Sequence, residues 1–109
     1  MTDKSAHNDT LRSFYKHIFI DYKKLIYALS SHDYAAVCST AHRMKGSCRI
    51  VGASALASGL VDLEIATEIR EQNRMDSAKQ KIEEAFAMLD AYLVEIGVIS
   101  NRKEDDYEH

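Results

Sequence analysis

The segment LRSFYKHIFIDYKKLIYAL (residues 11–29) decides the fold, because its apolar residues recur at spacings of three and four. This period matches the turn of an α-helix and gathers the apolar side chains on one face. The face consists of Leu11, Phe14, Tyr15, Ile18, Tyr22, Leu25, Ile26 and Leu29. We therefore expect a long amphipathic helix that starts at a Thr10 cap and needs other parts of the chain to cover it.

Three further segments repeat the pattern and can supply that cover. The second helix should start at a Ser30–Asp33 capping box and end at Arg49 or Ile50, before a break at Gly52. The third should start at a Ser54 cap and fade near Gln72. The fourth should follow an Asn73–Arg74 turn and stop at Gly97. Their apolar faces are Tyr34, Val37, Cys38, Ala41, Met44 and Cys48, then Leu56, Leu60, Leu63 and Thr67, then Ala78, Ile82, Ala85, Phe86, Leu89, Leu93 and Ile96.

Four such helices with short connections bury all four faces at once as an all-α, antiparallel up-down four-helix bundle. We expect one domain, with the bundle over about 10–97 and a charged, flexible tail over 101–109. Gly59 should allow its helix to approach a neighbour closely.

Composition narrows the possible functions. The chain has 109 residues, of which 46% are apolar, a net charge of -3, no proline and four glycines. No basic run suits a nucleic acid, and no segment resembles a secretory signal or a membrane span, so we expect a cytoplasmic protein. Cys38 and Cys48 lie ten positions apart on one helix, too far for a disulfide, and we interpret both as buried, reduced thiols. The spacing of the histidines and cysteines predicts no metal site.

The candidate chemistry centres on His42. A helical wheel places it on the flank of its helix, with Lys45 and Arg49 following along the same ridge. A neutral imidazole is a competent nucleophile, and the two cations would stabilise a phosphoryl group attached to it. Gly46 sits in the helix interior at a cost of about 1 kcal/mol, which predicts a bare patch for a partner's approach. Glu64 could hold the other ring nitrogen if its helix packs against that of His42.

These residues form a recognisable motif, Ala41-His42-Arg43-Met44-Lys45-Gly46-Ser47, followed by Gly52-Ala53, Leu56 and Leu63-Glu64. It resembles the signature of the histidine-containing phosphotransfer (HPt) family, with Met44 in place of the usual leucine, a volume-conserving change. The resemblance implies that His42 accepts a phosphoryl group, Lys45 provides charge beside it, Gly46 gives a partner clearance and Glu64 binds the ring. Arg49 lies outside the motif and is assigned on the helical wheel alone.

The resemblance also implies a mechanism and partners. His42 would take a phosphoryl group from a receiver-domain aspartate and pass it to a second receiver, as a carrier in a multistep His-Asp phosphorelay. The receivers would belong to a hybrid sensor kinase or a response regulator and would bring the Mg²⁺. We expect a monomeric phosphocarrier with no cofactor of its own and, since no Gly-rich nucleotide loop is present, no autokinase activity.

Four apolar residues lie off the core faces of their helices: Ile20, Tyr27, Val61 and Ile65. Their simplest interpretation is a wider core or ordinary surface exposure. If they surround His42, they would form the docking patch for a receiver. Two other functions remain open: a bundle that binds receivers without phosphotransfer, and a purely structural bundle.

Overall fold

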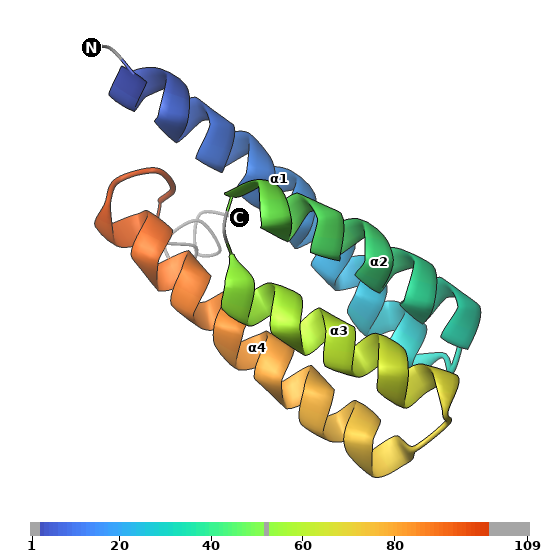
Figure 1. Ribbon diagram of the computed structural model, residues 1–109. Coiled ribbons are helices and arrows are strands. Elements are labelled where there is room, and N and C mark those ends of the chain that lie inside the picture. The colour runs from blue at the N-terminus through green and yellow to red at the C-terminus, as the bar shows by residue number, and fades with distance from the viewer. Residues whose placement is uncertain (1–2, 52, 101–109) are drawn as a thin grey trace, which may run out of the picture.

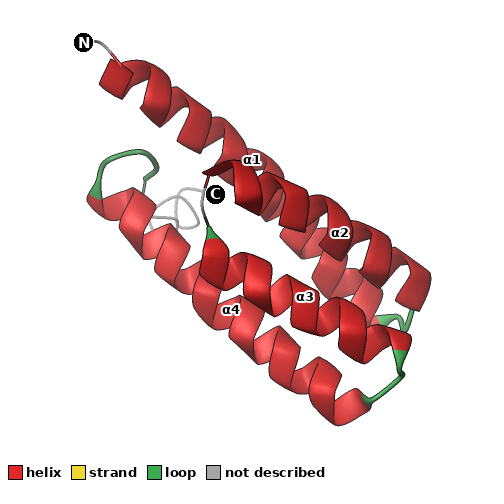
Figure 2. Ribbon diagram, in the orientation of Figure 1, coloured by secondary structure: helices red, strands yellow, loops and turns green. Residues whose placement is uncertain are grey.

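A computed structural model describes residues 3–51 and 53–100, which form four α-helices and no strand. The helices are α1 (Asp3–Ser30), α2 (Tyr34–Val51), α3 (Ser54–Glu68) and α4 (Gln72–Glu95). Each runs opposite to the one before it, and short connections join them at the ends of the bundle (Figures 1 and 2). The predicted all-α, antiparallel four-helix bundle is therefore confirmed. No helix in the described ranges is apolar over a stretch long enough to cross a membrane.

The core is built from the faces that the sequence predicted. Most of the expected residues are buried, among them Ile18, Leu25, Val37, Met44, Leu60, Leu63, Ile82 and Leu93, and others such as Tyr22, Leu29, Tyr34 and Leu89 are partly buried against them. Ile96 is instead exposed, at 40%, just beyond the end of α4, while Ala28, Met75 and Val98 are buried without having been predicted. Removing these side chains from water is the main source of the bundle's stability.

Close packing between α3 and α4 depends on Gly59, as expected. A Cβ atom at this position would lie 2.9 Å from Cγ1 of Ile82, closer than nonbonded carbons approach. On the other side of the bundle, the larger side chains of α1 reach α4. Tyr22 stacks on Phe86, Tyr15 contacts the same ring at a tilt, and the Tyr15 hydroxyl donates a hydrogen bond of 2.7 Å to Asp90.

The predicted starts of three helices need correction. α1 begins at Asp3 rather than after Thr10, because the polar residues before Leu11 contain no helix breaker. Ser30 and Asp33 do not form a capping box: the Ser30 hydroxyl donates to carbonyls of α1, and Asp33 caps α2 by accepting a hydrogen bond from the Ala36 amide. At α3 the cap position is occupied by Ala53, and Ser54 is already helical.

The connection between α3 and α4 also differs from the prediction. α3 ends at Glu68 instead of fading near Gln72, and Asn73 and Arg74 belong to the first turn of α4. The chain turns instead at Arg70, which has a positive φ of 58°. The predictions for Gly52 and for residues 101–109 lie outside the described residues.

Three helices end in the same way, with a residue in the left-handed conformation. His32 after α1, Arg70 after α3 and Gly97 after α4 have positive φ values of 58°, 58° and 80°. In each case the next amide donates to a carbonyl five residues back, as in Asp33 to Ala28. This pairing satisfies the carbonyl groups at the helix ends and sets the direction of the next helix.

Candidate functional site

His42 projects from the middle of α2 into solvent. Its side chain is 76% exposed, whereas Ala41 beside it on the helix is fully buried in the core. The predicted position on the flank of the helix is therefore confirmed. An imidazole placed in this way is accessible to a second protein.

The carboxylate of Glu64 lies between His42 and Lys45. Its Oε1 atom accepts a hydrogen bond of 2.6 Å from Nζ of Lys45, and its Oε2 atom is 3.9 Å from Nδ1 of His42. The first distance is that of a strong charge-assisted hydrogen bond, and the second is too long for a hydrogen bond. Glu64 thus faces the ring as the sequence suggested, but the hydrogen bond to the ring stays a prediction.

The two charged residues of this pair are sheltered. The side chains of Lys45 and Glu64 are only 15% and 21% exposed, because they lie in the seam where α2 packs on α3. Ion pairs of this kind are less screened by solvent than those on an open surface. The pair is therefore a fixed part of the site, in contrast to the exposed ring of His42.

A second ion pair beside His42 was not found from the sequence. Arg43 donates hydrogen bonds of 3.0 and 3.3 Å to the two carboxylate oxygens of Asp21 on α1. The hydrogen bond and the charge of Asp21 raise the pKa of Arg43 above its ordinary value. Residues 22 positions apart on different helices leave no periodic signal, so only the fold brings this pair together. It directs Arg43 towards α1, away from Glu64.

Gly46 and Arg49 complete the outer ridge of α2. A Cβ atom at Gly46 would meet nothing within 4 Å, so this glycine is not there to let a helix pack closely. Arg49 lies exposed in the last turn of α2 and has no hydrogen bond or ion pair to the described part of the chain. The ridge therefore combines an open patch with an available positive charge.

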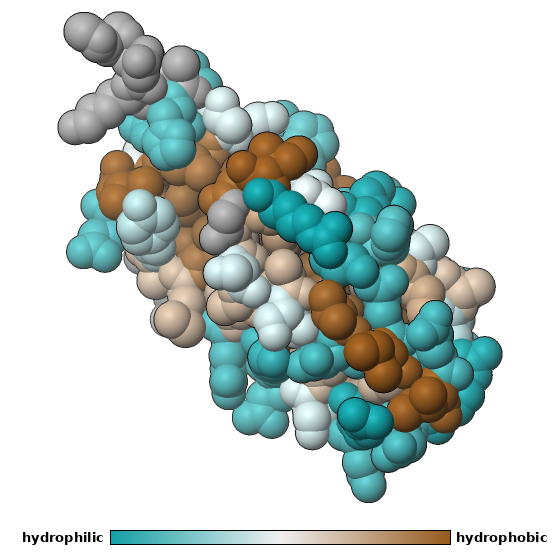
Figure 3. Space-filling view, viewed as in Figure 1, coloured by the Kyte–Doolittle hydropathy of each residue, from teal (hydrophilic) through white to brown (hydrophobic). Residues whose placement is uncertain are grey.

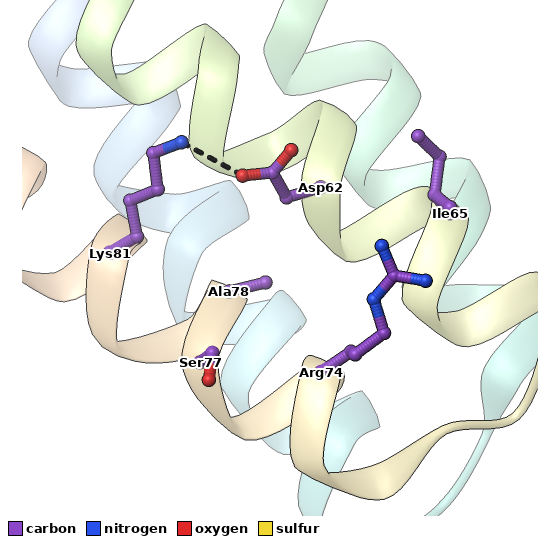
Figure 4. Close-up of a pocket in the computed structure, with 6 residues that line it drawn as sticks. All are labelled: Asp62, Ile65, Arg74, Ser77, Ala78 and Lys81. Atoms are coloured by element: carbon purple, nitrogen blue, oxygen red, sulfur yellow. Dashed lines mark hydrogen bonds and ion pairs between the residues drawn. The ribbon is translucent and has the colours of Figure 1, made fainter.

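Three of the four residues expected to form one docking patch line two different grooves. Ile20 and Tyr27 line a groove between α1 and α2, together with Lys23 and Lys24. Ile65 instead lies at a groove between α3 and α4, where Lys81 forms an ion pair with Asp62 (Figure 4). Ile20 and Tyr27 thus line a different groove from Ile65, and the docking patch stays a prediction.

The residues on α3 belong to an apolar row that is visible on the surface. Val61, Ile65 and Ile69 follow one another at a spacing of four, and Ile65 and Ile69 are 45% and 49% exposed. Figure 3 shows hydrophobic side chains in a line over the C-terminal half of α3. We call these three residues the α3 row; it lies on the helix that also carries Glu64.

The cysteines are free thiols, as predicted, but only Cys48 is fully buried. Burial raises the pKa of Cys48 to about 11. Burial, and then the charges of Glu68 and Glu64, raise the pKa of the partly buried Cys38. Both thiols are thus neutral and poorly reactive at neutral pH. Among the described residues, no group of three or more His, Cys, Asp and Glu side chains could hold a metal ion.

Comparison with known proteins gives one result. The sequence model of the family described as Hpt domain matches residues 9–95, which cover most of the bundle and include every residue of the site. Comparisons with curated proteins and with solved structures gave no match.

Proposed function

The chain belongs to the Hpt domain family, whose members transfer phosphoryl groups in His-Asp phosphorelays, and we propose that His42 is the residue that carries the phosphoryl group. One observation supports this assignment above the others. His42 presents an exposed imidazole whose Nδ1 faces the sheltered carboxylate of Glu64. A carboxylate on that side favours the tautomer with the proton on Nδ1, which leaves Nε2 as the nucleophile.

The proposed step is a direct transfer from a receiver domain. The Nε2 lone pair of neutral His42 attacks the phosphorus of an aspartyl phosphate, in line with the oxygen that leaves. The Nε2–P bond forms as the P–O bond breaks, and the aspartate departs as a carboxylate with the electron pair. The ring keeps its Nδ1 proton and gains positive charge, which Glu64 stabilises. Attack by the aspartate of a second receiver reverses these events.

The neighbouring residues have supporting roles in this proposal. Gly46 leaves space for the receiver's loop to reach the ring, since nothing occupies the position of its missing Cβ. Arg49 offsets part of the roughly two negative charges that a phosphoryl group adds. The resemblance implies the same role for Lys45, whose ammonium group donates one hydrogen bond to Glu64 and has further N–H donors.

The partners in this proposal are receiver domains of a hybrid sensor kinase or a response regulator in the cytoplasm, each with its own Mg²⁺. We assign docking first to the α3 row, because it shares its helix with Glu64, and second to the groove of Ile20 and Tyr27. An apolar contact surrounded by charges would provide affinity and partner selection. Hpt domains are phosphocarriers rather than enzymes, and we propose that this chain acts as a monomer and does not phosphorylate itself.

The experiment compares binding and transfer in the same samples. A receiver is phosphorylated with a small-molecule donor and Mg²⁺ and is then mixed with the wild-type chain or with His42→Gln. We expect both chains to bind, because glutamine preserves the shape of the site, and only the wild type to remove the phosphoryl group from the receiver. If both bind and neither accepts with any receiver in a panel, the chain is a docking module. If neither binds, the bundle is structural.

A further inference from the structure

The groove between α1 and α2 is lined mostly by apolar surface and carries two lysines. Ile20 and Tyr27 line it with 43% and 75% of their surfaces exposed, and the exposed Lys23 and Lys24 line it beside them. Asp33 is the only acid among the described lining residues, and its carboxylate already accepts the hydrogen bond that caps α2. The groove therefore suits an acidic segment that also carries an apolar side chain.

Positive charge continues from the groove along α1 towards its N-terminus. Residues 10–30 contain one acid, Asp21, whose two carboxylate oxygens accept hydrogen bonds from Arg43 of α2. The same residues contain four cations: Arg12, Lys16, Lys23 and Lys24. Lys16 and Lys24 are exposed and have no hydrogen bond or ion pair to the described residues. α1 thus presents a ridge of cations that its own acids do not offset.

The described part of the chain after α4 leads to this ridge. The C-terminal end of α4 and the N-terminal part of α1 lie at the same end of the bundle (Figure 1). Val98 is buried, and its carbonyl accepts a hydrogen bond of 2.9 Å from Nε of Arg12, which also pairs with Asp9. Ile99 packs against the core as well. The residues that follow Ser100 therefore start next to the first cation of the ridge.

An acidic segment of this chain can reach the groove from that point. Residues 104–108, with the sequence Glu-Asp-Asp-Tyr-Glu, carry four carboxylates and one tyrosine. They follow Ser100 by four to eight positions, which an extended chain spans over up to about 13–26 Å. Ile20 and Tyr27 lie about 12 and 22 Å beyond Arg12 along the axis of α1. The two spans agree, and Tyr27 lies within about 60° of Arg12 around that axis.

We propose that the acidic segment 104–108 binds in the groove of its own chain. Its carboxylates pair with Lys23 and Lys24, and the ring of Tyr107 covers Tyr27. Each of these contacts is weak. The tether gives the segment an effective concentration at the groove of the order of 1 mM, so weak contacts are sufficient. The segment then covers the exposed apolar side chains of the groove, and a partner that uses this surface must displace it.

Zero-length cross-linking tests this inference, because a carbodiimide joins an amino group to a carboxylate only where the two are in contact. The full chain is treated at low protein concentration, digested and analysed by mass spectrometry. We expect the links of residues 104–108 to go mainly to Lys23 and Lys24. Links that spread evenly over the other lysines overturn the inference, and so does the absence of links to the groove.

Two controls belong to the same experiment. The ion pair of Lys81 and Asp62, with 2.8 Å between its atoms, provides a link that should form in every sample. A mixture of chains labelled with ¹⁴N and ¹⁵N shows whether a link joins one chain or two. Links to the groove that join two chains would mean that the segment of a second copy occupies it, and would overturn the inference.

A second measurement detects the contact by NMR without a reagent. One variant combines Glu104→Gln, Asp105→Asn, Asp106→Asn and Glu108→Gln. Its matched control, Arg102→Gln with Lys103→Gln, removes charges of the opposite sign from the same part of the chain. We expect the first variant to shift the amide signals of Lys23, Lys24 and Tyr27 and to leave those of the α3 row unchanged, and the control to shift neither set. Unchanged groove signals in the first variant contradict the inference. Neither measurement involves phosphoryl transfer, so a negative result leaves the carrier role of His42 untouched.

Discussion

Two glycines on neighbouring helices should respond in opposite ways to the same substitution. Both lie in helix interiors, where alanine is favoured over glycine by about 1 kcal/mol. At Gly46 the new methyl group meets nothing within 4 Å, so Gly46→Ala should raise the free energy of unfolding by about 1 kcal/mol. For a domain of this size that corresponds to an increase of about 4 °C in Tm.

At Gly59 the same methyl group meets a packed neighbour. It would lie 2.9 Å from Cγ1 of Ile82 and 3.4 Å from the backbone nitrogen of that residue, so α3 and α4 must move apart. Overpacking of this kind costs about 1–3 kcal/mol, which exceeds the gain in helix propensity in most of that range. Gly59→Ala should therefore lower the free energy of unfolding, by up to about 2 kcal/mol.

Urea and thermal unfolding followed by circular dichroism measure both values in matched samples. A destabilised Gly46→Ala would refute the conclusion that this position is open. The functional half of the argument needs a larger side chain. Gly46→Leu should remain folded but accept the phosphoryl group at least about tenfold more slowly, because a small displacement of the reacting groups is costly. Normal transfer by that variant would refute the proposed clearance.

Three further predictions follow from other parts of the structure. Thr67→Val should raise the free energy of unfolding by about 1 kcal/mol, because the Thr67 hydroxyl is buried with no hydrogen-bond partner in the described residues; a loss in urea unfolding would show that a buried water satisfies it. Burial raises the pKa of Cys48 from 9.0 to about 11, so above pH 9 the unfolded chain loses this proton first and stability falls as the pH approaches 11. The slope should be smaller in Cys48→Ala, and identical slopes would contradict the shift. Ile65→Asp should weaken receiver binding more than Tyr27→Asp in titration calorimetry, and the opposite order would move docking to the groove between α1 and α2.

The ends of the helices show what the sequence could and could not predict. Three helices end on a left-handed residue, yet the sequence predicted that turn only at Gly97, where glycine adopts the conformation at no steric cost. Arg70 adopts it because other contacts compensate. Arg70 donates a hydrogen bond of 2.9 Å to the carbonyl of Thr67 and stacks on the ring of Tyr34. Such contacts between helices leave no trace in the local sequence.

The candidate site, too, could be predicted from the sequence only in part. Periodicity alone placed His42 on the surface and the residues around it in the core, because both follow from the position on one helix. The family motif predicted that Glu64 lies beside the imidazole ring of His42. It did not reveal that Lys45 is bound to Glu64, or that Asp21 holds Arg43, because those contacts depend on which helices pack together and at what angle. The positions of Ile20 and Tyr27 in one groove and of Ile65 in another depend on the same packing.

The carrier role of His42 is tested most directly by the intact mass of the chain after mixing with a freshly phosphorylated receiver and Mg²⁺. The proposal predicts a gain of about 80 Da, the mass of one phosphoryl group, that is labile in acid, stable in base and absent in His42→Gln. Incubation with a second receiver should then remove it. A gain of the same mass in His42→Gln would contradict the assignment, and so would the absence of any gain with every receiver that binds the chain.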